Sequence, residues 1–206
     1  MRKSVDCVHL EVGAGALVLF AALLLLLPVQ WVMGMVLAAA VHECFHALAV
    51  YSMGGKILRL SIGTRGALME ATPMQGARAL ACSLAGPAGS MLLLLFARWL
   101  PRTALCGLIQ GCYNLLPLLP LDGGRAMSCL LELLLSPERA AGVMRVIQIS
   151  LRLLLLALVA WTAVRTGIWL LFAVAALLCL PTAEIKLAKK PIWRYNRHNI
   201  DKGVRL

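Results

Sequence analysis

Residues 31–53 read WVMGMVLAAAVHECFHALAVYSM, an almost wholly apolar segment that carries His-Glu-Cys-Phe-His at 42–46. Residues four apart lie on the same face of a helix, so His42 and His46 can hold one metal ion between them. Glu43 lies beside that face, where a carboxylate can take a proton from a water that the metal activates. The segment therefore predicts metal-dependent hydrolysis within a membrane.

The composition of the whole chain is typical of a membrane protein. Its 206 residues are 61% hydrophobic, and the mean hydropathy is +0.86. A straight membrane span needs about 20 apolar residues. The fold class that we predict is an all-α integral membrane domain with about six transmembrane helices, and no separate soluble domain. The expected spans lie at roughly 12–28, 30–53, 79–97, 103–121, 146–164 and 167–181.

The basic residues predict the orientation in the membrane. The formal charge is +11, and with six spans and a cytoplasmic N-terminus only Arg98, Arg102 and Arg165 of the 20 Lys and Arg residues fall outside. Cytoplasmic segments carry the excess of cations in membrane proteins, so we expect both termini in the cytoplasm. We divide the chain into a transmembrane metalloprotease domain at 1–185 and a basic cytoplasmic tail at 186–206. Because topology accounts for the charge, nucleic acid is not an expected partner.

A short membrane-associated β-hairpin is expected after the second span. Residues 56–62 alternate in polarity, residues 63–66 carry two glycines suited to a turn, and residues 67–71 can return as a second strand. An exposed strand edge can pair with an extended peptide, the form in which a protease binds its substrate. A plain cytoplasmic loop is the alternative.

A second polar site lies in a segment that breaks a helix at membrane depth. Residues 114–125 read NLLPLLPLDGGR, with two prolines and two glycines, and unwound backbone in a membrane must be buried in protein or line a polar cavity. Of the nine acids only Glu43 and Asp122 fall well inside the hydrophobic layer, and of the four histidines only His42 and His46 lie in a span. Two imidazoles, one carboxylate and a second acid as base make up a catalytic zinc site. We therefore predict one Zn²⁺ per chain, held by His42, His46 and Asp122, with Glu43 as the catalytic base.

Cysteines are not expected to take part in this site. The seven cysteines form no Cys-x-x-Cys pair, which argues against a disulfide framework or a cysteine metal site. Cys44 lies about 200° around the helix from His42 and is not assigned to the metal.

These motifs resemble those of the site-2 protease family of intramembrane zinc metalloproteases. The residues that carry the resemblance are HECFH at 42–46, LAGP at 84–87 and NLLPLLPLDGGR at 114–125. The last is most similar to the bacterial branch that includes stage IV sporulation protein FB. The resemblance extends from about residue 12 to 181, and we expect no counterpart of that branch's nucleotide-sensing CBS domain, since the chain ends at Leu206.

The resemblance implies a multi-pass protease of the bacterial cell membrane. Its substrate would be a membrane-embedded or membrane-tethered protein, such as a sigma factor precursor or an anti-sigma factor, and other partners would be the lipid bilayer and regulatory membrane proteins. By position, Asn114 would bind substrate through hydrogen bonds to its backbone, and a polar packing role is the alternative. The resemblance also suggests a role in sporulation.

Two other functions are compatible with the same residues. A non-catalytic membrane metal carrier would use the same ligands, but it predicts further polar ligands in other spans and repeat symmetry between the halves, and the sequence shows neither. A membrane scaffold with a vestigial motif is the third hypothesis, although both the base and the third ligand are present.

Overall fold

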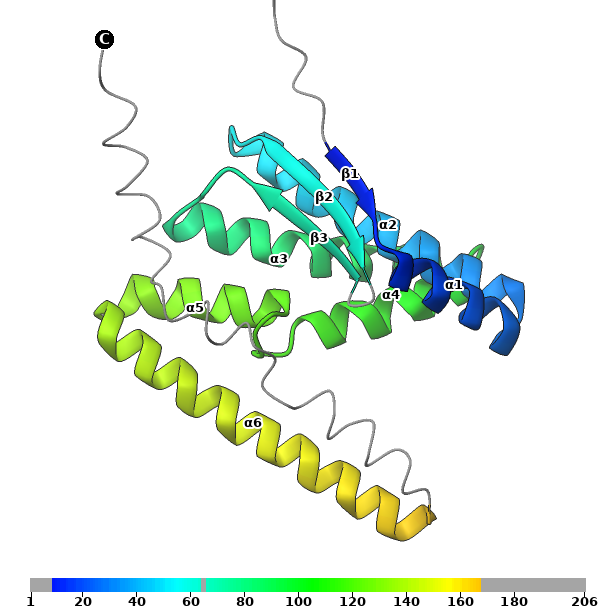
Figure 1. Ribbon diagram of the computed structural model, residues 1–206. Coiled ribbons are helices and arrows are strands. Elements are labelled where there is room, and N and C mark those ends of the chain that lie inside the picture. Colours follow the sequence, from blue (N-terminus) through cyan, green and yellow to red (C-terminus); the bar gives the residue numbers. More distant parts are fainter. Residues whose placement is uncertain (1–8, 64–65, 168–206) are drawn as a thin grey trace, which may run out of the picture. The chain divides into compact units, whose positions relative to one another are not determined.

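The computed structural model describes residues 9–63 and 66–167 (Figure 1). The chain divides into two compact units, residues 1–148 and 149–206, and α6 runs from the first into the second. The elements in chain order are β1 (His9–Val12), α1 (Ala14–Leu26), α2 (Val29–Ser52), β2 (Ile57–Gly63), β3 (Gly66–Ala71), α3 (Gly76–Leu92), the 3-10 helix η1 (Leu93–Phe96), α4 (Pro101–Asn114), α5 (Asp122–Leu134) and α6 (Pro137–Thr166).

Three of the described helical segments are long and apolar enough to cross a membrane. They are Val29–Ser52, Gly76–Phe96 and Pro137–Thr166, which correspond to the second, third and fifth predicted spans. Their side chains are largely exposed in the isolated chain, as expected for surfaces that face lipid. The structure therefore supports an integral membrane fold.

The first and fourth predicted spans are shorter as helices than the apolar stretches that predict them. The helix at the first is α1, which has 13 residues and is shorter than a straight span of about 20 residues. In the fourth, α4 ends at Asn114 and the chain then turns, so the helix break predicted from the prolines and glycines of 114–125 is present. The sixth, 167–181, and the tail at 186–206 lie outside the described residues, apart from Gly167.

The predicted hairpin is present but belongs to a three-stranded sheet. β2 and β3 pair antiparallel, with Leu60 opposite Met69, as the alternation indicated. β1 adds to the other edge of β2 in parallel, with Leu10 beside Leu60. Arg59 of β2 also forms an exposed ion pair with Glu11 of β1. The four residues of β1 are too few for a periodicity signal, so their pairing with β2, which lies far along the chain, decides their conformation.

Small residues bring α3 close to both of its neighbouring helices. A Cβ at Gly86 would overlap the imidazole of His46 on α2, and one at Gly89 would overlap the ring of Phe45. On the other side, Gly107 and Gly111 of α4 approach backbone oxygens of α3. Such residues, here the Ala-Gly-Pro-Ala-Gly-Ser segment at 85–90, let helix backbones pack closely in a membrane. The close packing fixes the relative position of α2 and α3.

Candidate metal centre

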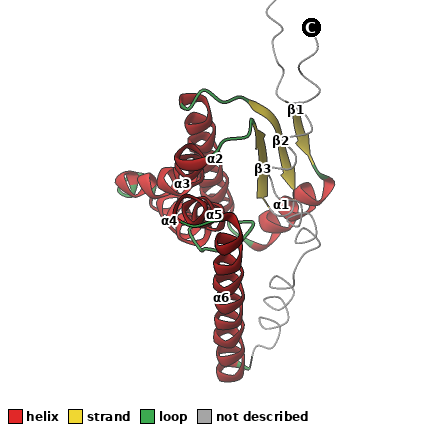
Figure 2. Cartoon of the chain, turned by 90° about the vertical axis from the view of Figure 1, so that its left-hand side faces the viewer, coloured by secondary structure: helices red, strands yellow, loops and turns green. Residues whose placement is uncertain are grey.

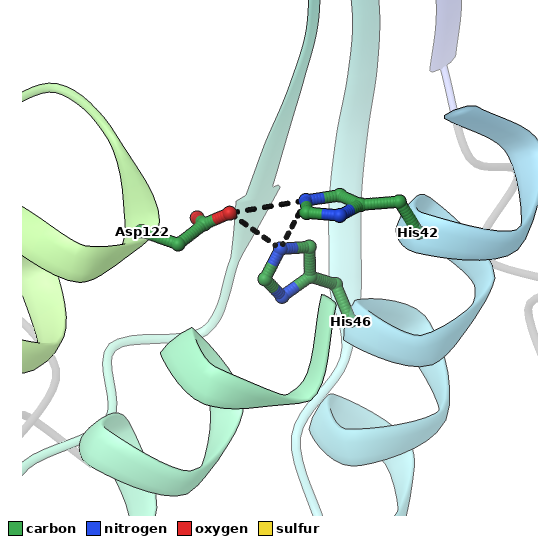
Figure 3. A group of neighbouring side chains, drawn as sticks. All are labelled: His42, His46 and Asp122. Atoms are coloured by element: carbon green, nitrogen blue, oxygen red, sulfur yellow. Dashed lines mark hydrogen bonds and ion pairs between the residues drawn. The ribbon is translucent and has the colours of Figure 1, made fainter. Parts of the chain in front are cut away.

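Two residues of α2 and one of α5 bring three potential metal ligands together (Figure 3). Nε2 of His42 lies 3.0 Å from Oδ2 of Asp122, and Nε2 of His46 lies 3.2 Å from the same oxygen. The two Nε2 atoms are 3.2 Å apart. The structure thus unites residues that are 80 positions apart in the sequence.

These distances fit a zinc ion. In a tetrahedral site with bonds of about 2.0–2.2 Å, neighbouring ligand atoms lie about 3.3–3.6 Å apart, and the three distances here, 3.0–3.2 Å, are only slightly shorter. Two imidazoles and one carboxylate are also the donor set of catalytic zinc sites, which keep a fourth position open. The residues present therefore fit the predicted ion in both spacing and chemistry.

The tautomer of His46 leaves its Nε2 atom able to bind a cation within the cluster. Nδ1 of His46 lies 2.8 Å from the backbone oxygen of Cys82. A carbonyl oxygen only accepts, so Nδ1–H donates this bond, and the lone pair of Nε2 faces His42 and Asp122. Electron-rich atoms at such distances repel one another unless a proton or a metal ion lies among them. The cluster is therefore suited to a divalent cation.

The start of α5 positions Asp122. α5 begins at Asp122 itself, directly after the loop that follows α4. A Cβ at Gly123 would overlap the backbone of Leu115, and one at Gly124 that of Leu118, so only glycines allow the first turn to pack on the preceding loop. Asp122 is buried there, where the helix dipole favours a carboxylate.

Gly124→Ala is therefore expected to weaken zinc binding at least about tenfold and to destabilise the fold by about 1–3 kcal/mol. The added methyl group would meet backbone atoms that cannot move cheaply, and Asp122 would be pushed away from the histidines. Chelator competition and thermal unfolding measure the two effects. Gly142→Ala in α6 is the matched control: its Cβ would meet open space, so unchanged affinity and equal or higher stability are expected. Equal zinc affinity in the two variants would contradict this account.

Glu43 lies next to the cluster without joining it. Its carboxylate is partly buried on α2 and interacts electrostatically with His46, His42, Asp122 and Arg125. No side-chain hydrogen bond ties it to another described residue, so its oxygens are free to accept a proton. The exposed Arg125 was not among the candidates from the sequence, although it follows directly on the Asp-Gly-Gly motif.

Asn114 and Cys44 lie outside the cluster. Asn114 is the last residue of α4, half-buried, and its side chain makes no hydrogen bond to another described residue. Its role in substrate binding stays a prediction. Cys44 is an exposed free thiol and is absent from the ligand group, in line with the sequence interpretation.

Two residues of α3 contact the histidines and were not predicted as site residues. Ser90 places its hydroxyl 2.8 Å from Nδ1 of His42, and the Cys82 carbonyl binds His46. The signal in the sequence is the small-residue segment of α3 at 85–90, which by itself indicates close helix packing and not a site.

Comparisons with known proteins support the fold. No family model and no curated protein matches the sequence. Among solved structures, the chain is similar to the site-2 protease from Methanocaldococcus jannaschii, with a TM-score of 0.59 and 20% sequence identity. The match covers 85% of this chain and 89% of that chain. The chain thus has a fold like that of a site-2 protease, with a candidate zinc-ligand cluster that suggests a membrane metalloprotease.

Proposed function

We propose that this chain is an intramembrane zinc metalloendopeptidase that hydrolyses a peptide bond of a membrane-spanning or membrane-tethered protein. The observation that carries the proposal is the convergence of His42, His46 and Asp122 beside Glu43, with both histidines on a helix long enough to cross a membrane. A zinc ion bound by these three residues would supply Lewis acidity, which polarises the scissile carbonyl and activates water.

The side chains around the centre then have separate tasks. Glu43 takes a proton from the attacking water and delivers it to the leaving amine, as a general base and then a general acid. Asn114, half-buried and with a free amide, offers hydrogen bonds to the substrate backbone. Because the centre lies within an apolar segment, the substrate must unwind locally to reach it.

The sheet provides a place where an unwound substrate can bind. β1 occupies one edge of β2, so the open edges of the described sheet are the outer sides of β1 and β3. β3 is the strand nearest to α3 and α5 in both views, and β1 is the farthest (Figures 1 and 2). An extended substrate segment would therefore add to β3, where main-chain hydrogen bonds hold it near the metal centre.

A photo-crosslinking amino acid at Glu70 is expected to capture substrate several-fold more efficiently than one at Glu11. Both are exposed glutamates, on β3 and β1 respectively, so each variant serves as the control for the other. The experiment uses the Glu43→Gln background, in which bound substrate is not cleaved, and a substrate identified as described below. Crosslinks of equal yield, or a preference for Glu11, would contradict binding at β3.

The cellular part of the proposal follows the resemblance stated from the sequence. The protein would reside in a bacterial cell membrane with both termini in the cytoplasm, and its substrates would be proteins such as a sigma factor precursor or an anti-sigma factor. Membrane proteomes of cells with wild-type protein and with Glu43→Gln test this directly. We expect at least one membrane protein to accumulate at full length only in the variant, and identical proteomes would contradict the proposal.

The metal-carrier hypothesis predicts a different result. Among the described residues, His42, His46 and Asp122 form the one group of three or more potential ligands, so no further described cluster offers a transport path. Zinc uptake into vesicles that contain the purified protein would favour a carrier. Cleavage without uptake is the outcome that the protease proposal requires.

A further inference from the structure

Three positions of α3, each four residues apart, face the two histidines of the metal centre. Residues at this spacing lie on one face of a helix, and on α3 they are Cys82, Gly86 and Ser90. The carbonyl of Cys82 accepts a hydrogen bond from His46, Gly86 leaves room for the same imidazole, and Ser90 contacts His42. One face of α3 therefore contacts both imidazoles of α2: Cys82 and Ser90 bind their Nδ1 atoms, and Gly86 lies against the Nε2 edge of His46.

We propose that Ser90 is a positioning residue for the metal centre, which orients His42 and accepts the hydrogen bond from Nδ1–H in the tautomer that can bind the ion. Its Oγ lies 2.8 Å from Nδ1 of His42, while Nε2 of the same ring faces Asp122. A neutral imidazole carries one N–H, so Nδ1–H donating to the Ser90 hydroxyl leaves the Nε2 lone pair facing the centre. The Cys82 carbonyl imposes the same tautomer on His46.

Among the described residues, Ser90 is the one hydrogen-bond partner of Nδ1 of His42, and both side chains are buried. Ser90 is 0% exposed and His42 is 3% exposed, so bulk water has no route to replace the hydroxyl. Without it, the metal-binding tautomer of His42 has a buried Nδ1–H with no acceptor, which disfavours this tautomer relative to the one in which Nε2–H points at Asp122 and opposes a cation. Hydrogen-bond partners of this kind orient metal-binding histidines and raise their basicity, and their loss costs typically about 10–100-fold in metal affinity.

Zinc affinity of the full-length protein in detergent, without substrate, tests the inference. By competition with a chelator, Ser90→Ala is expected to bind zinc about 10–100-fold more weakly than wild type, and the absorption bands of bound Co²⁺ are expected to shift. Ser83→Ala is the matched control, because its hydroxyl lies on the same helix and bonds to the Ala79 carbonyl. It should retain wild-type affinity and Co²⁺ spectrum.

Ser90→Thr separates hydrogen bonding from packing. It keeps a hydroxyl on the same carbon, so it should recover most of the affinity lost in Ser90→Ala, and its comparison with wild type stands even if the alanine variant does not fold. Wild-type zinc affinity and an unshifted Co²⁺ spectrum in Ser90→Ala would overturn the inference, as would a threonine variant that folds but binds zinc as weakly as Ser90→Ala.

The inference rests on the metal site of the proposed function, and the same assay distinguishes their failures. If wild-type protein binds no zinc, the proposed function fails. If it binds zinc with the same affinity as Ser90→Ala, only the role of Ser90 fails.

Discussion

Glu43→Gln is expected to lower the rate of peptide-bond cleavage by about 10²–10⁴-fold, the usual contribution of a general base. One zinc ion per chain is expected to stay bound. The amide has nearly the size of the carboxylate but cannot take a proton from water. Because the candidate ligand group consists of His42, His46 and Asp122, the substitution leaves this group intact. The measurements are zinc content and the rate of substrate cleavage by purified protein in lipid vesicles.

A matched acid outside the centre controls for the loss of a charge. Glu132 is an exposed acid of α5 and is no member of the ligand cluster, so Glu132→Gln should cleave at the wild-type rate. Undiminished cleavage by Glu43→Gln would remove Glu43 from the mechanism. Loss of zinc together with activity would instead make Glu43 part of the binding site.

Asp122→Ala is expected to eliminate both zinc binding and cleavage. The substitution removes the single anionic member of the ligand group and leaves two imidazoles, which do not complete a three-ligand catalytic site. The loss of affinity should exceed the 10–100-fold that is typical when only the hydrogen-bond partner of a ligand is removed. Elemental analysis of purified protein and chelator competition measure the effect.

Asp201→Ala is the control for this second experiment, because it removes an acid of the basic tail and should leave zinc content unchanged. A full complement of zinc in Asp122→Ala would show that the third ligand is another residue. Zinc loss in Asp122→Ala, retention in Glu43→Gln and partial loss in Ser90→Ala together would assign one role to each residue.

The local features of the fold were predictable from the sequence. The second span was expected at 30–53 and α2 extends over Val29–Ser52, because a long apolar segment in a membrane forms a helix to satisfy its backbone. The alternation around Leu60 indicates the strands of the hairpin. The glycines of α3 indicate that this helix packs closely against its neighbours. Each of these signals is contained in neighbouring residues.

Features that depend on distant segments were not predictable. β1 forms because Glu11 and its neighbours pair with β2, nearly 50 residues away along the chain. The helix break within 114–125 was predicted from its prolines and glycines, but the end of α4 at Asn114 and the start of α5 at Asp122 depend on how the loop backbone packs against Gly123 and Gly124. By hydropathy alone, residues 103–121 form one continuous apolar stretch.

The sequence by itself determined the chemistry of the candidate site. His42 and His46 share a helix face by their spacing, and Asp122 and Glu43 are the acids that an apolar layer would otherwise exclude. Only the tertiary structure decided that the ligand atoms lie 3.0–3.2 Å apart and that α3 holds the far sides of both imidazoles. The physical reason is that residue types and spacing along one helix are local properties, whereas the separation of α2, α3 and α5 is set by the close packing that their glycines permit.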